Sequence, residues 1–232
     1  MRQALRRSRP TPVTFALLGG LAALYVLSCI PGGLSLASLI NGPSVPELVQ
    51  VGGNARDLTF TEMELWRLLT ATLLHGGFVH ILMNSLALWN LGGQLEEVAG
   101  GEEVLLAFVV TGIVGSLASA CFGNPQIISI GASGAICGLF GFICAVGTRN
   151  VGQLFEQLRR NVMNIVLLLG LGFIIPNVDN WAHIGGILSG IALGFFYRPQ
   201  SRDRRRVLGV LSAAVLVYGA YRITANVFPG LG

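Results

Sequence analysis

Residues 104–148, VLLAFVVTGIVGSLASACFGNPQIISIGASGAICGLFGFICAVGT, contain no charged side chain. The stretch is too long for one membrane-spanning helix, which needs about 20 mostly apolar residues because lipid cannot hydrogen-bond a bare backbone. Gly123, Asn124 and Pro125 in its middle are typical of a turn. The stretch therefore predicts two spanning helices, over about residues 104–120 and 133–146.

Apolar segments on either side of this pair raise the prediction to seven spanning helices. The chain of 232 residues is 53% hydrophobic and only 11% charged, with a mean hydropathy of +0.69, whereas soluble domains carry roughly 25% charged residues. The other five segments are residues 13–30, 73–95, 163–177, 181–197 and 207–221. The predicted fold class is an all-α polytopic membrane protein.

The basic residues, all of them arginines, lie mostly on one side of the predicted membrane. They precede the first helix, separate the fourth from the fifth, and follow the sixth: Arg2, Arg6, Arg7, Arg9, Arg149, Arg159, Arg160, Arg198, Arg202, Arg204, Arg205 and Arg206. Only Arg56, Arg67 and Arg222 fall on the other side. This bias predicts a cytoplasmic N-terminus. The net charge of +4 is thus a topology signal, and no nucleic-acid partner is expected.

The expected organisation has four parts in one membrane-embedded chain. A basic cytoplasmic N-terminus (1–12) precedes a six-helix core (13–197), an Arg-rich cytoplasmic linker (198–206), and a seventh helix with the C-terminus (207–232). The first apolar run is expected to be retained as a helix rather than removed as a signal peptide. Residues 31–65 form a long extracytoplasmic loop, predicted to lie at the membrane interface, and residues 148–161 an amphipathic cytoplasmic connector.

Polar side chains inside predicted spanning helices are the candidate functional residues, because such groups are costly in lipid. Ser133 opens the fourth helix and His183 lies near the start of the sixth, so both are expected near the outer ends of parallel helices. His80 and Asn84 are four residues apart and share one face of the second helix. Histidine is the usual base that activates a hydroxyl at neutral pH. His80, Asn84 and the Ser133 N–H could then stabilise an oxyanion.

Small residues make a meeting of Ser133 and His183 plausible. The fourth helix carries Gly134 and Gly138, and the sixth carries a stripe of small residues four apart: Ala182, Gly186, Gly190 and Gly194. Such stripes let helix backbones approach closely in lipid. A lone serine in a spanning helix more often bonds its own backbone, and a lone His or Asn more often joins helices. The combination of all four at one depth favours a catalytic site.

At these residues the chain resembles the rhomboid family of intramembrane proteases. The resemblance is carried by HxxxxHxxxN (His75, His80, Asn84), GxSG (131–134, with Gly131 and Gly134) and AHxxG (Ala182, His183, Gly186), with Trp66-Arg67 before the second helix and Glu96 at its inner end. The motifs agree in order and spacing over roughly residues 60–197. Many members have an aromatic residue one turn after the serine, where this chain has Cys137.

The resemblance implies a six-helix rhomboid core plus one C-terminal transmembrane helix. It implies Ser133 as nucleophile and His183 as base, a dyad without aspartate, with His80 and Asn84 in the oxyanion hole. Structural support would come from Trp66, Arg67, His75, Glu96, Gly131, Gly134, Ala182 and Gly186. The implied partners are the lipid bilayer and single-span transmembrane protein substrates, cut near their outer ends.

Other readings of these residues are less well supported. A metalloprotease would need HExxH, but His75 and His80 are five apart with no Glu between them. An aspartyl protease would need two facing Asp, and Asp57, Asp179 and Asp203 all lie outside the predicted helices. No metal or other cofactor is expected. The remaining alternative is a non-proteolytic membrane chaperone or transporter on the same scaffold. The expected location is a bacterial inner membrane, with the active site on the extracytoplasmic side.

Overall fold

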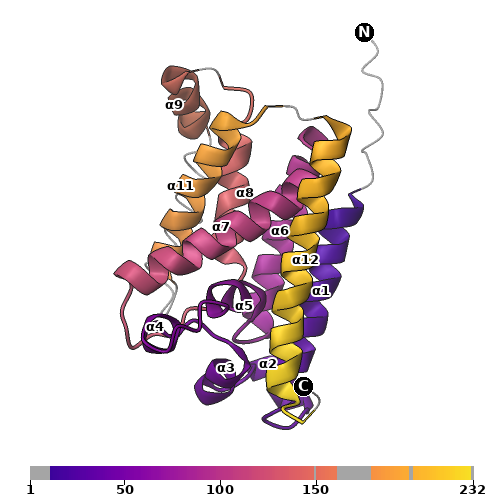
Figure 1. Cartoon of the computed structure of the whole chain (residues 1–232), viewed down its shortest axis with the longest axis vertical. Coiled ribbons are helices and arrows are strands. Elements are labelled where there is room, and N and C mark those ends of the chain that lie inside the picture. Colours follow the sequence, from indigo (N-terminus) through magenta and orange to yellow (C-terminus); the bar gives the residue numbers. More distant parts are fainter. Residues whose placement is uncertain (1–10, 149, 161–178, 199–200, 231–232) are drawn as a thin grey trace.

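The computed structural model describes residues 11–148, 150–160, 179–198 and 201–230, and throughout these ranges its regular elements are helices (Figure 1). The helices are α1 (Pro12–Ser28), α2 (Leu36–Asn41), α3 (Val45–Val51), α4 (Arg56–Phe60), α5 (Arg67–Leu73), α6 (Phe78–Val98), α7 (Gly101–Phe122), α8 (Ser133–Ala145), α9 (Val151–Arg160), α11 (Asn180–Phe196) and α12 (Arg202–Val227). The predicted fold class, an all-α polytopic membrane protein, is confirmed. Six of the seven expected spans correspond to described helices, and the fifth, residues 163–177, lies outside the described residues.

Two described helices, α7 and α12, are long and apolar enough to cross a membrane on their own. The helices α1 and α8 are apolar but shorter, and α5 with α6 passes the same test only when the two are taken together. In Figure 1 α1 and α12 run roughly along the vertical axis and α7 crosses the bundle obliquely, with α2 to α5 in the lower part and α9 at the upper end. The short helices α2 to α5 therefore lie toward the end that the arginine pattern predicts to be extracytoplasmic, and α9 lies at the opposite end.

The second span was expected over residues 73–95, and its predicted first residue is wrong. Leu73 ends α5, the chain turns by 91° across a short break, and the long helix α6 begins only at Phe78. Because residues 73–95 are mostly apolar, hydropathy alone does not show this break. The end of α2 lies against this break: a Cβ on Gly77 would lie 3.1 Å from the Asn41 carbonyl oxygen, and one on Gly42 would lie 2.5 Å from the Gly76 carbonyl oxygen.

The seventh helix is longer than the sequence suggested. Helix α12 begins at Arg202, inside the stretch expected as a linker (198–206), and continues past Tyr221 to Val227. Ser201 caps its first turn by accepting a hydrogen bond from the Arg204 N–H. Arginine is a good helix former, so a charged segment next to an apolar one can continue the same helix.

Helix α8 occupies the centre of the bundle and carries the first residue of the candidate site. Nearly all of its side chains are buried, and Ile136 and Leu139 pack in one core cluster with Phe108 of α7 and Leu88 of α6. A helix that is apolar on every face is one that neighbours surround. Ser133 at the start of α8 is thus held on a helix that has little freedom to move.

Glu96, near the inner end of α6, joins that helix to α1. Its carboxylate accepts hydrogen bonds from the backbone N–H groups of Val13 and Thr14 and from the Thr14 hydroxyl, at 3.0, 2.8 and 2.7 Å. The first N–H groups of a helix have no helical acceptor, and a carboxylate there also complements the positive end of the helix dipole. Glu96 therefore acts as the N-terminal cap of α1.

Candidate active site

Ser133 and His183 meet, although fifty residues separate them. The Ser133 Oγ lies 2.9 Å from the His183 Nε2, a normal hydrogen-bond distance. His183 is buried, at 5% exposure, whereas Ser133 is half-buried and keeps some access from outside the protein. Within the described residues the other ring nitrogen of His183, Nδ1, has no hydrogen-bond partner. The pair has the arrangement of a nucleophile and its general base.

Glycine packing between α8 and α11 makes this meeting possible. A Cβ on Gly186 would overlap the Gly134 carbonyl oxygen, and one on Gly190 would overlap the Gly138 carbonyl oxygen. Gly194 continues the contact further along α11, against the backbone of Phe142. The stripe predicted from the sequence therefore faces α8, with backbone against backbone, and this close approach carries His183 to Ser133.

The start of α11 is fixed by its own cap. Asp179 accepts a hydrogen bond from the Ala182 N–H at 3.0 Å, and its carbonyl oxygen accepts one from the His183 N–H at 3.2 Å. The Ala182 carbonyl oxygen in turn lies against Gly134, where a Cβ would be 3.2 Å away. His183 is thus placed by the first turn of its helix. Cys137, one turn after Ser133, is buried within α8.

His80 and Asn84 lie beside the loop that precedes Ser133. A Cβ on Gly131 would lie 2.7 Å from the His80 Nε2 and 3.9 Å from the Asn84 Nδ2. Gly131 also has a φ of +118°, which side chains other than glycine rarely adopt. The Asn84 side-chain amide donates to the His80 carbonyl oxygen at 3.0 Å. Both residues are therefore near the serine, in a space that only glycine leaves open.

His75 supports His80 from the break between α5 and α6. Its ring is fully buried and meets the His80 ring edge-on, with the centroids 5.1 Å apart. The Gly76 N–H donates to the His80 Nδ1 at 3.4 Å, so Nδ1 is the acceptor and Nε2 carries the proton in that arrangement. His80 is consequently oriented with a donor on its Nε2.

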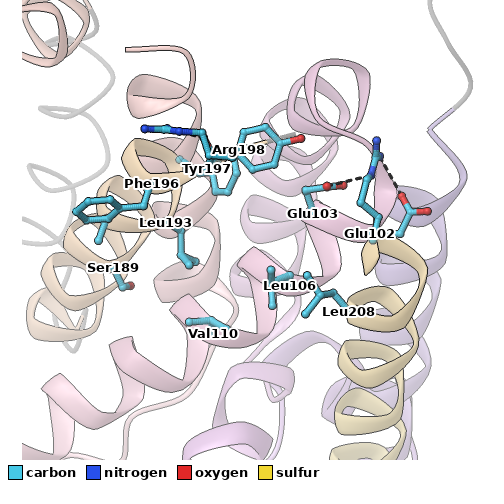
Figure 2. Close-up of a pocket in the computed structure, with 13 residues that line it drawn as sticks. Glu102, Glu103, Leu106, Val110, Ser189, Leu193, Phe196, Tyr197, Arg198 and Leu208 are labelled. Atoms are coloured by element: carbon cyan, nitrogen blue, oxygen red, sulfur yellow. Dashed lines mark hydrogen bonds and ion pairs between the residues drawn. The ribbon is translucent and has the colours of Figure 1, made fainter. Parts of the chain in front are cut away.

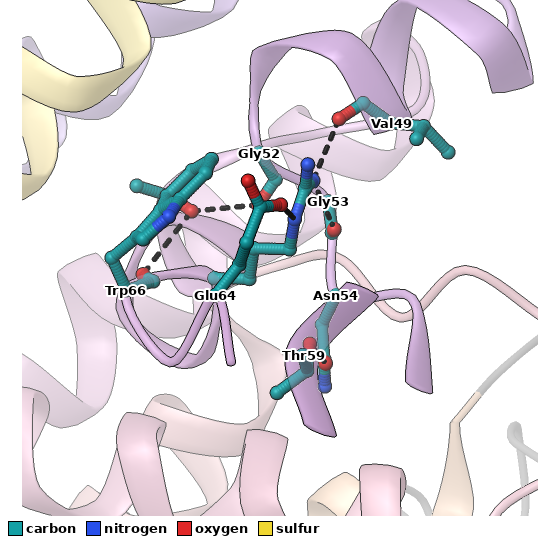
Figure 3. Close-up of polar contacts among 9 residues, drawn as sticks. Val49, Gly52, Gly53, Asn54, Thr59, Glu64 and Trp66 are labelled. Carbon is teal, nitrogen blue, oxygen red and sulfur yellow. Dashed lines mark hydrogen bonds and ion pairs between the residues drawn. The ribbon is translucent and has the colours of Figure 1, made fainter. Parts of the chain in front are cut away.

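Trp66 and Arg67 organise the loop before α5 (Figure 3). Arg67 is buried and bonds to the carbonyl oxygens of Val49 and Gly53 at 2.7 and 3.0 Å, while its Nε contacts the Glu64 carboxylate at 2.5 Å. Its Cζ lies 4.6 Å from the centroid of the Trp66 ring. This arginine therefore joins the end of α3 and the loop after it to the start of α5, as a second donor to carbonyl groups that also accept the backbone N–H groups of Gly52 and Ala55.

Asn54 ties the same loop to the strand-like segment before the serine, and sequence reasoning missed it. Its backbone N–H and C=O pair with those of Ser129, both at 3.1 Å, and its side-chain amide donates to the Ser116 carbonyl oxygen at 2.9 Å. Thr59 donates to the Asn54 Oδ1 at 2.8 Å. The Gly131 N–H donates to the Ala71 carbonyl oxygen at 2.8 Å. No spacing pattern marks such contacts, because each depends on loop geometry.

A cavity of about 440 Å³ lies elsewhere, between α7, α11 and the start of α12 (Figure 2). Leu106, Leu193 and Leu208 line it, with Arg198 and the ion pairs of Arg205 with Glu102 and Glu103 at its rim. Its lining includes neither Ser133 nor His183. Among the described residues no group of three His, Cys, Asp or Glu side chains is placed to hold a metal ion.

Comparison with known proteins gives concordant matches. A model of the rhomboid domain matches residues 62–200. "RHOMBOID-like protein 5" of Arabidopsis thaliana is 39% identical over 171 residues, covering 70% of this chain and 54% of that protein. "Rhomboid protease GluP" of Bacillus subtilis (strain 168) is 39% identical over 154 residues, covering 65% of this chain and 30% of that protein. The chain thus spans about half of the first relative and less than a third of the second.

Proposed function

This chain belongs to the rhomboid family, and on that premise we propose that it is an intramembrane serine endopeptidase whose nucleophile is Ser133. The observation that carries the proposal is the 2.9 Å contact between the Ser133 Oγ and the His183 Nε2. The relative named "Rhomboid protease GluP", which is 39% identical, supports the same class of activity. Several other relatives are named only as rhomboid-like.

The proposed mechanism uses two side chains in covalent catalysis. The Ser133 Oγ attacks the carbonyl carbon of the substrate, and its proton passes to the His183 Nε2. His183, then protonated, gives the proton to the leaving amine as the C–N bond breaks. Water hydrolyses the acyl-serine ester by the same route in reverse. The role requires Nδ1 of His183 to carry the proton in the resting state, because Nε2 must accept one.

The oxyanion formed during each attack needs hydrogen-bond donors near Ser133. The His80 Nε2 and the Asn84 Nδ2 both lie beside Gly131, two residues before the serine. The Ser133 N–H is the first of helix α8 and has no acceptor within that helix. We propose these three groups as the oxyanion hole, in which preorganised donors stabilise developing charge.

The proposed substrates are single-span transmembrane proteins cut near the extracytoplasmic boundary. The arginine bias places the ends of α8 and α11 that carry Ser133 and His183 on that side. The proposed location is a bacterial inner membrane with a cytoplasmic N-terminus. A substrate helix must unwind before cleavage, because a helical peptide bond is shielded by its own turn.

The test is cleavage of a panel of single-span reporters by the purified protein in liposomes. We expect the wild type to cleave at least one reporter, and Ser133→Ala and His183→Ala to lose nearly all activity, because the two residues act as a unit. A serine-directed fluorophosphonate probe should label the wild type and leave Ser133→Ala unlabelled.

The same assay decides the alternative of a non-proteolytic chaperone or transporter. A folded wild type that cleaves no reporter and takes up no probe would favour that alternative. Full activity in Ser133→Ala would show that the nucleophile lies elsewhere.

A further inference from the structure

Two arginines contact the same indole ring in the extracytoplasmic part of the protein. The Cζ of Arg222, on α12, lies 4.0 Å from the centroid of the Trp66 ring, and the Cζ of Arg67 lies 4.6 Å from it. Both distances are within the range of a cation–π contact. Arg67 is itself anchored to the carbonyl oxygens of Val49, in α3, and of Gly53, in the loop that follows. Arg222 therefore joins the seventh helix to the Trp66-Arg67 unit.

Direct packing accompanies this contact. Gly219, one turn before Arg222, lies against α5, where an added Cβ would be 3.0 Å from both Leu69 and Leu73. The Gln50 side chain donates to the Asn226 carbonyl oxygen at 3.4 Å, which ties α3 to the end of α12. Helix α12 thus holds the outer surface of the unit made by α3, α5 and Trp66.

The inner side of α5 holds the loop that precedes the serine. The Ala71 carbonyl oxygen, in the last turn of α5, accepts the Gly131 N–H at 2.8 Å. Carbonyl groups in the last turn of a helix lack a complete set of helical partners, so this one is available to the loop. Ser133 follows two residues later. A continuous series of contacts therefore links Arg222 to the nucleophile through Trp66 and α5.

Arg222 lies at a position where an arginine is energetically costly without a partner. It lies within an apolar helix, on the side of the membrane where arginines are otherwise rare in this chain. An arginine in a spanning helix is costly unless it has a partner or reaches the interface. Its described contacts are the Trp66 ring and, at 3.1 Å, the Tyr218 hydroxyl.

We propose that Arg222 is a positioning residue for the Ser133 site, acting through Trp66, and that this is what the seventh helix contributes to catalysis. The inference rests on the proposed protease function. Arg222 touches neither substrate nor reacting atoms. It fixes α5, and α5 fixes the loop that sets the position of Ser133.

The experiment compares Arg222→Gln and Arg222→Lys with Arg206→Gln, the same exchange at an exposed site at the other end of α12. Cleavage of a reporter is measured in liposomes, with thermal unfolding followed in detergent. We expect Arg222→Gln to lower kcat roughly tenfold to a hundredfold, because small misplacements of catalytic groups have effects of that size. KM should not change. Arg222→Lys should retain more activity, because it keeps the cation, and Arg206→Gln should behave as the wild type.

A second arm tests the route through Trp66. In a Trp66→Leu background Arg222→Gln should lower kcat by less than about twofold, since coupled residues are not additive. Fluorophosphonate labelling of Ser133 should slow in Arg222→Gln in parallel with kcat.

Each other outcome overturns the positioning role. For Arg222→Gln these outcomes are a wild-type kcat, an increase in KM alone, or a loss of activity that the unfolded fraction at the assay temperature explains. Equal losses of kcat in Arg222→Lys and Arg222→Gln would also overturn it, as would losses of kcat that add to those of Trp66→Leu. Failure of the protease function is a different result, in which wild type and Ser133→Ala do not differ in cleavage or labelling. The positioning role would then fall with it.

Discussion

At the scale of single residues, the three arginines that the sequence predicts to lie on the extracytoplasmic side are held by specific partners. The Arg56 guanidinium donates to the Ala120 and Gly123 carbonyl oxygens at 2.5 and 2.8 Å, where α7 ends and its carbonyls lack helical donors. Arg67 donates to the carbonyl oxygens of Val49 and Gly53, and Arg222 lies against Trp66. Each of the three exceptions to the predicted arginine bias therefore has a structural partner. Arg222 lies just beyond the span expected from the sequence, residues 207–221, so only the continuation of α12 to Val227 places it within the helix and beside Trp66.

Asn84 and His80 give a prediction about turnover. Removing one oxyanion donor typically lowers turnover by about 10²–10³. We therefore expect Asn84→Ala to lower kcat by about that factor with little change in KM, and His80→Ala to lower it at least as much. Initial rates over a range of reporter densities in liposomes measure both constants. Asn90→Ala, exposed on the same helix, is the control. Unchanged rates in both variants would show that other groups hold the oxyanion.

Glu96 gives a prediction about stability. Its buried carboxylate is the acceptor for three groups at the start of α1, and hydrogen bonds to a charged group contribute about 1.5–3 kcal/mol. We expect Glu96→Gln to lower the free energy of unfolding by about 2 kcal/mol. That corresponds to a Tm lower by roughly 4–8 °C for a chain of this size. Thermal unfolding in detergent measures the change. The exposed neighbour Glu97, changed to Gln, should leave Tm unaltered.

At the scale of helices, the sequence predicted correctly those helices whose ends coincide with a change from apolar residues to polar or turn-forming ones. The expected spans 104–120, 133–146 and 181–197 lie within a few residues of α7, α8 and α11. The turn between α5 and α6 could not be predicted in the same way. It depends on α2 lying against Gly76 and Gly77, a contact between segments far apart in the chain. Hydropathy reports which residues avoid water, and it carries no information about such contacts.

The interface between α8 and α11 gives a prediction about glycine. Gly186→Leu should separate the helices, because even a Cβ there would overlap the Gly134 carbonyl oxygen. We expect at least a tenfold loss of cleavage together with a lower Tm. Gly186→Ala should show a smaller change in the same direction. Gly20→Leu is a matched control, since a Cβ on Gly20 meets nothing within 4 Å. A stable and active Gly186→Leu protein would contradict the assigned packing.

At the scale of the whole molecule, the pairing of Ser133 with His183 was predictable because two separate signals agreed. The expected topology put both residues near the outer ends of parallel helices, and the glycine stripe was expected to bring those helices together. The supporting loops were not predictable, because Asn54 and the Ala71 carbonyl act through backbone hydrogen bonds that leave no spacing pattern.

The orientation of the molecule gives a prediction about the cut. We expect cleavage close to the extracytoplasmic boundary, at a small residue, in segments with Gly or Pro just below it. Such residues lower the cost of unwinding, because Gly disfavours a helix interior by about 1 kcal/mol and Pro by about 3. Mass spectrometry of the products locates the cut. Replacing the Gly or Pro by Leu should slow cleavage, and a cut in the cytoplasmic half would overturn the assigned orientation.

The backbone contact between α8 and α11 has a consequence for kinetics. Helices joined through glycines have few side chains between them to rearrange, so the Ser133 Oγ and the His183 Nε2, the proposed nucleophile and base, stay aligned before any substrate arrives. The entropy of bringing those two groups together is lost during folding and not again at each turnover. Differences between substrates in the activation free energy of cleavage should then come from the unwinding and entry of the substrate helix. The measured activation parameters should accordingly change with the substrate sequence far more than with the reactivity of Ser133 toward a small probe.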